Sequence, residues 1–131
     1  MVQETEQKEN KTTNLVNAII EGLHKKKGID VISLNLTEIE NAVCKYFVIC
    51  HASSDRQVEA LADSVLETTK EKLDEKAWHK EGLDTATWVL LDYADVVVHI
   101  FQEEYRKMYK LEELWADATI TRHEDTNNAN N

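Results

Sequence analysis

The sequence of 131 residues contains no proline and only three glycines, which are isolated from one another at positions 22, 28 and 82. A loop that cradles phosphate needs several glycines close together, because the backbone N–H groups must approach the ligand. This class of nucleotide site is therefore excluded. The chain also lacks a Pro-rich or Gly-rich linker, and its length suits one hydrophobic core, so we expect a single domain.

Basic residues are also few, with 15 Lys and Arg against 25 Asp and Glu and a formal net charge of −10. Phosphate binding needs clustered Lys and Arg, so free nucleic acid is not expected as a partner. An acidic surface suits a basic protein surface, or serves solubility alone. The two cysteines, Cys44 and Cys50, have no further ligand at zinc spacing. We expect buried or half-buried thiols, no metal site and no cofactor.

Long apolar runs are absent as well. No run approaches the roughly 18 residues that a membrane-spanning helix requires. The N-terminal segment MVQETEQKENKTTN has neither the apolar stretch of a signal peptide nor an Arg-rich amphipathic pattern. The sequence therefore predicts a cytoplasmic protein with reduced thiols and no membrane partner.

The first half of the chain carries clear secondary-structure patterns. Residues 1–12 have no apolar anchors and are expected to be a disordered lead. Residues 14–28 have an apolar stripe at helical spacing. Strands are expected at 29–36 and 46–50, followed by a helix whose start is marked by the capping-box spacing of Ser54 and Gln57.

The second half predicts a short strand within 77–82, a hairpin over 88–101 and a C-terminal helix over 103–115. Residues 119–131 are polar and are expected to be a disordered tail. The folded domain is then 13–118. Its order of elements is typical of a single α/β domain with a mixed β-sheet and flanking helices.

Candidate catalytic residues gather at Cys50, His51, Ser53 and Ser54. Successive residues of a strand point to opposite faces, which separates Cys50 from His51, and Ser54 already serves as a helix cap. A strand, two serines and a helix followed by Asp92 and Asp95 loosely resemble a metal-dependent nucleotidyltransferase. No third carboxylate joins the pair, so that activity is kept as the alternative function.

The hairpin TWVLLDYADVVVHIF has two dissimilar faces. A two-residue turn at Tyr93–Ala94 would place Asp92 opposite Asp95 and Trp88 opposite His99. The other face is aliphatic and is expected to be core: Val89, Leu91, Val96, Val98 and Ile100. The face with Trp88 has the composition of an interface hot spot. It would equally suit packing under the C-terminal helix, with the aspartates favouring a turn, and both interpretations remain open.

Several blocks together resemble the ribosomal silencing factors, or Iojap-like proteins, over residues 14–118. These blocks are DVISLNL at 30–36, YFVICHASSDRQVEALAD at 46–63, Glu81–Gly82, the hairpin at 87–101 and YRKMYKLEELW at 105–115. The resemblance implies a nucleotidyltransferase-like fold without catalytic residues, and therefore a protein that is not an enzyme.

The resemblance also implies a partner. Members of the family bind the large ribosomal subunit at its universal ribosomal protein fourteen and sterically block the small subunit, which represses translation when nutrients are limiting. By position, the partner-binding residues would be Glu81, Trp88, Asp92, Tyr93 and Asp95. A homodimer through the same mixed face is a further alternative.

The hairpin departs from the family pattern at one point that bears on its register. Ala94 stands where many relatives have glycine, and a positive φ at alanine would cost about 1 kcal/mol. A longer turn is therefore an alternative to the two-residue turn.

Overall fold

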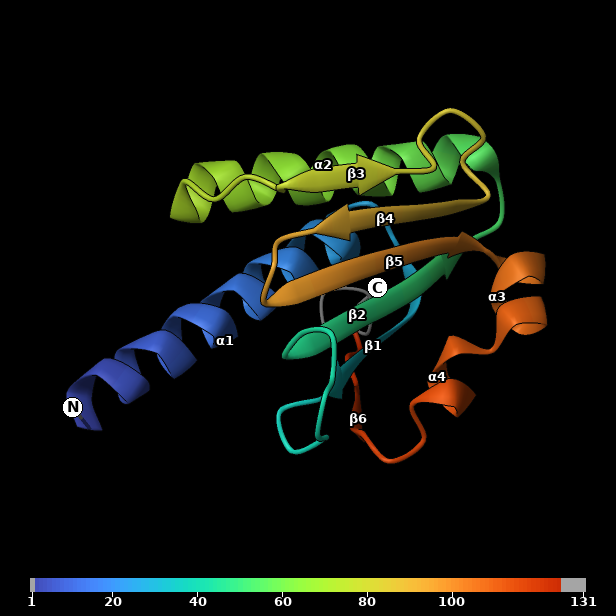
Figure 1. Ribbon diagram of the computed structural model, residues 1–131. Coiled ribbons are helices and arrows are strands. Elements are labelled where there is room, and N and C mark those ends of the chain that lie inside the picture. The colour runs from blue at the N-terminus through green and yellow to red at the C-terminus, as the bar shows by residue number, and fades with distance from the viewer. Residues whose placement is uncertain (1, 126–131) are drawn as a thin grey trace.

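The computed structural model describes the backbone of residues 2–125 and the side chains of residues 7–125. It confirms the predicted α/β fold: six strands form one mixed sheet in the order β3-β4-β5-β2-β1-β6 (Figure 1). Only the central pair β2–β5 is parallel among these neighbours. The strands are β1 Ile29–Asn35, β2 Tyr46–Ala52, β3 His79–Glu81, β4 Trp88–Asp92, β5 Val96–Gln102 and β6 Thr119–Arg122. None of the described helices is long and apolar enough to span a membrane.

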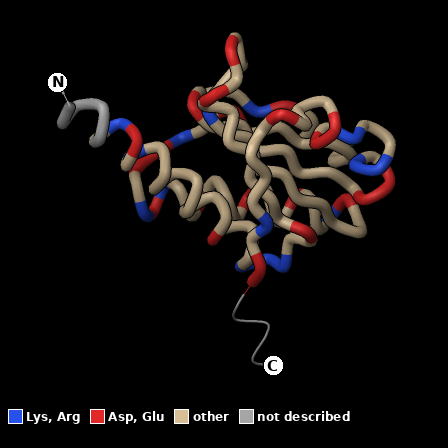
Figure 2. The backbone as a smooth tube through the Cα atoms, turned by 90° about the horizontal axis from the view of Figure 1, so that it is seen from below, with Lys and Arg blue, Asp and Glu red and all other residues tan. Residues whose placement is uncertain are grey.

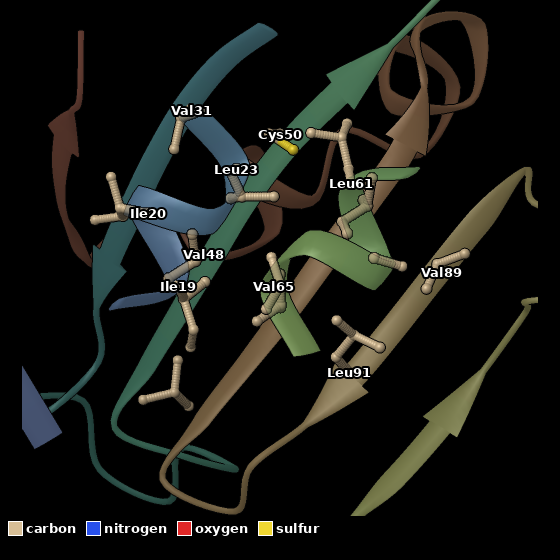
Figure 3. Packing of buried hydrophobic residues seen from close by; sticks show 14 of the residues in the cluster. Ile19, Ile20, Leu23, Val31, Val48, Cys50, Leu61, Val65, Val89 and Leu91 are labelled. Atoms are coloured by element: carbon tan, nitrogen blue, oxygen red, sulfur yellow. The ribbon is translucent and has the colours of Figure 1, made fainter. Parts of the chain in front are cut away.

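Two long helices, α1 (Val2–Lys25) and α2 (Asp55–Leu73), cover one face of the sheet, which we call the helix-packed face. Figure 3 shows Ile19 and Leu23 of α1 and Leu61 of α2 pointing at the strands. All the side chains predicted to form the aliphatic face of the hairpin are fully buried here: Val89, Leu91, Val96, Val98 and Ile100. Each such burial contributes about 1.5–3 kcal/mol, so this layer is the main source of stability.

The N-terminal region differs from the expected disordered lead, because α1 already begins at Val2. Residues 2–12 are rich in Gln, Glu and Lys, which are good helix formers and extend a helix without apolar anchors. Thr12 is buried, and Lys11 Nζ lies 3.5 Å from Glu75 Oε1 after α2. The first turns of α1 extend beyond the sheet (Figure 1). Met1 lies outside the described residues.

The start of α2 follows the predicted capping pattern. The hydroxyl of Ser54 accepts a hydrogen bond from the backbone N–H of Gln57 at 3.2 Å. The side chain of Gln57 accepts from the backbone N–H of Ser53 instead of Ser54, also at 3.2 Å. The two side chains therefore satisfy free N–H groups at the helix start, as a capping box does. The difference is that the Gln57 side chain accepts from the N–H of Ser53, one residue before the N-cap.

The C-terminal helix predicted over 103–115 is two short helices, α3 (Glu103–Tyr109) and α4 (Leu111–Leu114). The break lies at Lys110, which takes a left-handed φ of 48°. Arg106 is buried and holds both helices to the sheet, with Nε donating to Glu112 Oε1 at 2.8 Å and Nη1 to Asp30 O at 2.8 Å. A left-handed residue at the end of a helix is usually glycine, and here it is lysine. The sequence alone therefore does not indicate this break.

The expected disordered tail also differs, since Thr119–Arg122 form β6 along the edge of β1. All four residues are exposed, so the strand has no apolar alternation to predict it. Backbone pairing holds it, and Ser33 Oγ lies 2.7 Å from His123 Nε2 just beyond it. Residues 126–131 of the predicted tail lie outside the described residues.

Candidate partner-binding surface

The hairpin register differs from the predicted one by two residues. Asp92 pairs with Val97 and Trp88 pairs with Phe101, so the predicted Asp92–Asp95 and Trp88–His99 pairs are wrong. The turn is longer than two residues, and Tyr93 N donates to Val96 O at 2.9 Å. The alternative of a longer turn is therefore confirmed, but it does not avoid the unfavourable backbone conformation, since Ala94 has a positive φ of 73°. Because side chains alternate with a period of two, a shift of two residues leaves every strand residue on its predicted face.

The two aspartates have separate roles in this turn. Asp92 Oδ1 accepts a hydrogen bond from Ala94 N at 2.7 Å, and the residue lies opposite His79 of β3. Asp95 Oδ2 lies 3.8 Å from Lys45 Nζ and 3.5 Å from Thr12 Oγ1 of α1. The two carboxylates therefore do not face each other across this hairpin, and Asp95 lies toward the helix-packed face.

Tyr93 occupies the core of the helix-packed face. Its side chain is 6% exposed, and its hydroxyl lies 2.8 Å from Thr69 Oγ1 of α2. Burial raises the pKa of its phenol. Of the five residues predicted to bind a partner, Tyr93 is the one whose side chain is buried, and it does not offer a contact surface.

Three of the predicted residues do come together on the other face of the sheet, which we call the second face. Glu81 pairs with Leu90, and its strand β3 forms the edge of the sheet. The residues of β3 and β4 on this face are all exposed or half-buried, and we call them the edge surface: His79, Glu81, Trp88, Leu90 and Asp92. Sequence reasoning missed His79, although its spacing of two from Glu81 places both on one side of a strand.

The packing interpretation of the Trp88 face holds in part, and the interface interpretation stays a prediction. The C-terminal segment covers a second core that includes Phe47, Phe101 and Leu111. Trp88 lies at the border of this core. Its ring stacks on Phe101 at 4.9 Å between centroids and contacts Tyr109 at 4.9 Å. The indole is half-buried, so one part packs as core and the remainder faces outward.

Apolar side chains of the C-terminal segment remain exposed on either side of the break at Lys110. Leu111 is buried, while Met108 is 65% and Leu114 75% exposed. Met108 adjoins Tyr109, which touches Trp88. Large exposed apolar side chains in the segment that packs on Trp88 through Tyr109 suit a protein partner.

The connection that carries Trp88 depends on one glycine. Gly82 has a φ of 82°, and a Cβ at this position would lie 2.0 Å from the carbonyl oxygen of Trp88. Ala86 N donates to Gly82 O at 2.8 Å and closes the loop between β3 and β4. Only glycine permits this approach, so Gly82 places Glu81 and Trp88 on adjoining strands.

The candidate catalytic residues serve the fold. Burial raises the pKa of the Cys50 thiol to about 12, which keeps it protonated. His51 Nδ1 accepts from Arg106 Nη1 at 3.0 Å, and burial, with the nearby Arg106 charge, lowers its pKa. Among the described side chains, those of residues 7–125, no group of three or more His, Cys, Asp or Glu could hold a metal ion.

Residues 8–131 match the family model described as "Ribosomal silencing factor during starvation". The chain belongs to this family. Ribosomal silencing factor RsfS of Bacillus subtilis is 42% identical over 98 residues, which are 72% of this chain and 79% of that protein. A crystal structure of a protein from Chromobacterium violaceum has a TM-score of 0.75 at 34% identity, covering 79% of this chain and 85% of that chain.

A more distant relative is named for the ribosome as well. The mouse protein "Mitochondrial assembly of ribosomal large subunit protein 1" is 33% identical over 72 residues, 53% of this chain and 32% of that protein. The predicted resemblance to the ribosomal silencing factors is thus confirmed. Family membership implies a role in the regulation of translation.

Proposed function

We propose that this protein binds the large ribosomal subunit at its universal ribosomal protein fourteen and sterically blocks the small subunit from joining. It would thereby repress translation in the cytoplasm when nutrients are limiting. Membership of the silencing-factor family supports this proposal, and so does the name of the mouse relative, which refers to the ribosomal large subunit. A steric block needs a stable surface, and it requires no catalytic residue, metal or cofactor.

The observation that carries the proposal is the edge surface. It combines a half-buried tryptophan with two carboxylates, Glu81 and Asp92, on one face of the sheet edge. Trp88 would be the anchor, because a partner could complete the burial of a ring already held in place. Glu81 and Asp92 would form charge-assisted hydrogen bonds with Lys and Arg of the ribosomal protein. Asp95 would lie at the rim, and Tyr93 would take no part.

A sucrose-gradient assay with purified subunits tests the proposal. The protein should sediment with large subunits and reduce the fraction of joined ribosomes. Trp88→Ala should weaken binding tenfold or more, which corresponds to about 1.4 kcal/mol. Trp78→Ala is the matched control: Trp78 is 81% exposed and, with residues of α1 and Asp95, lines a depression beside the hairpin turn. It adjoins His79 in sequence, but strand parity directs its side chain to the face opposite the edge surface. This variant should bind as the unmodified protein does.

Thermal unfolding of each variant separates lost contacts from lost structure. Unchanged sedimentation of a folded Trp88→Ala variant would remove Trp88 from the interface. Failure of the unmodified protein to bind large subunits would refute the proposal itself. Magnesium-dependent binding of nucleoside triphosphates in calorimetry would favour the nucleotidyltransferase alternative, and light scattering over a dilution series would detect a homodimer.

A further inference from the structure

His99 lies in the middle of β5 on the second face and is 4% exposed. Its ring is surrounded by aromatic side chains. Phe47 meets it edge-on at 4.7 Å between centroids, Phe101 is nearly parallel to it at 6.3 Å, and Trp88 lies at 5.9 Å. The one hydrogen bond of its imidazole among the described residues is to Trp88, whose indole Nε1 donates to His99 Nδ1 at 3.1 Å.

This hydrogen bond determines the protonation of the imidazole. Since Nδ1 accepts, the proton of the neutral ring must lie on Nε2. Nε2 is buried and has no hydrogen-bond partner among the described residues. An unpaired buried N–H destabilises a fold, and a leucine in this apolar site would avoid that cost. An apolar residue would therefore stabilise this site better than the histidine does. The contact with Trp88 is the one feature that an apolar residue could not replace.

The contact restricts the indole of Trp88. The indole already stacks on Phe101 and makes a tilted contact with Tyr109, at an angle of 42° between the ring planes. Stacking alone leaves an aromatic ring free to slide or flip, because it has little directional preference, whereas a hydrogen bond has a direction. With Nε1 directed at a buried acceptor, the indole presents one edge to the outside and keeps its polar N–H away from a partner.

We propose that His99 is a positioning residue of the edge surface, whose Nδ1 holds the Trp88 indole in its binding orientation before a partner arrives. The inference rests on the proposed function. Preorganisation of this kind raises affinity because the ring loses little freedom on binding. The neutrality of the imidazole, which burial maintains by lowering its pKa to about 4, keeps Nδ1 available as an acceptor at neutral pH.

Three substitutions separate positioning from packing. His99→Leu removes the acceptor and keeps the volume, while His99→Asn keeps an acceptor close to the position of Nδ1. Replacing Trp88 with its benzothiophene analogue removes only the donor, since sulfur takes the place of Nε1–H. In ¹⁵N-labelled free protein, His99→Leu should move the Trp88 indole N–H resonance and speed its exchange with solvent, and His99→Asn should largely restore both.

Binding to purified large subunits supplies the second measurement. His99→Leu and the benzothiophene analogue should each weaken binding about five- to tenfold, with His99→Asn close to the unmodified protein. Combined, the two changes should cost no more than either alone, because both remove the same hydrogen bond. If His99→Leu does not fold, the analogue at position 88 tests the same bond from the donor side.

Each remaining outcome counts against the inference. A shifted indole resonance with unchanged affinity would overturn the positioning role. An unshifted resonance would overturn the hydrogen bond. Additive losses in the combined variant would show that His99 acts through packing. If the unmodified protein fails to bind large subunits, the proposed function fails with it, and the spectrum of the free protein then decides the hydrogen bond alone.

Discussion

At the scale of single residues, the hairpin places two neighbouring side chains in different environments, one at the surface and one in the core. Asp92 stays at the surface and holds the turn, while Tyr93 enters the core against α2. A polar residue next to a conspicuous acid is easily assigned to the same surface. Strand parity separates the two, because consecutive side chains leave a strand on opposite sides.

Tyr93→Phe tests this separation. The substitution removes the hydroxyl that lies 2.8 Å from Thr69 Oγ1 and leaves the ring in place. The free energy of unfolding should fall by about 1 kcal/mol, as for a typical buried hydrogen bond. Affinity for the large subunit should not change. Urea unfolding and gradient sedimentation measure the two quantities, and a loss of affinity without a loss of stability would return Tyr93 to the contact surface.

We expect the buried imidazole of His99 to make the free energy of unfolding depend on pH. Burial lowers its pKa from 6.5 to about 4, and no charge contributes to that shift. The unfolded chain therefore takes up a proton near pH 6.5 that the folded chain does not take up until about pH 4. The stabilisation is complete above pH 6.5 and is lost as pH falls from 6.5 to 4, by about 3 kcal/mol.

The measurement is urea unfolding of the unmodified protein and of His99→Leu at several pH values in this range. Other groups also contribute to the pH dependence of stability, because folding lowers their pKa values as well: His51, His123, Glu21 and Glu103. The difference between the two proteins isolates the contribution of His99. An identical slope in both would mean that the imidazole does not remain neutral in the folded state.

At the scale of elements, the edge surface depends on how β3 joins β4. The connection turns at Gly82, where the backbone passes close to the carbonyl of Trp88. The strand β3 has only three residues, and all three are exposed. Little apolar burial holds it, so the geometry of the loop decides whether Glu81 lies beside Leu90.

Gly82→Ala should therefore disturb this edge. A Cβ would lie 2.0 Å from a backbone oxygen, and the positive φ adds strain. We expect a loss of about 2–4 kcal/mol in the free energy of unfolding, from left-handed strain together with overpacking. Binding to the large subunit should weaken as β3 detaches. Thr85→Ala in the same exposed loop is the control and should change neither quantity; equal stability for Gly82→Ala would show that the loop can relax.

At the scale of the whole molecule, acidic and basic residues are interspersed along the backbone and neither sign is confined to one end (Figure 2). The net charge of −10 still gives the molecule a negative potential beyond its surface. Toward a basic ribosomal protein, such a potential would speed association, while the carboxylates of the edge surface would orient the encounter.

Neutralising two acids separates these effects. Glu81→Gln with Asp92→Asn removes two charges, and the amide oxygen of the new Asn can still accept from Ala94 N. The association rate should fall several-fold at low salt and depend less on ionic strength. Glu67→Gln with Glu71→Gln changes the net charge equally on exposed positions of α2, on the opposite face. Stopped-flow binding should show a smaller effect for this pair, and an equal effect would mean that net charge alone acts.

Much of this architecture is determined locally. The stripe of α1, the cap of α2 and the alternation in β4 and β5 arise from residues close in sequence, which is why the faces of the hairpin could be predicted before its register. The family resemblance likewise depends on local blocks, because Glu81, Trp88 and Asp92 each lie within a recognisable motif.

Tertiary structure decided the rest. The register of β4 on β5 depends on the turn at Ala94, the break at Lys110 on the anchorage of Arg106, and β6 on a free edge of β1. The last two are settled by contacts between residues distant in sequence, and the register by a backbone conformation at Ala94 that is unusual for alanine; no local periodicity encodes either. The sequence by itself therefore determined which side chains share a face, while the tertiary structure decided which of them remain exposed, since exposure depends on what the rest of the chain covers.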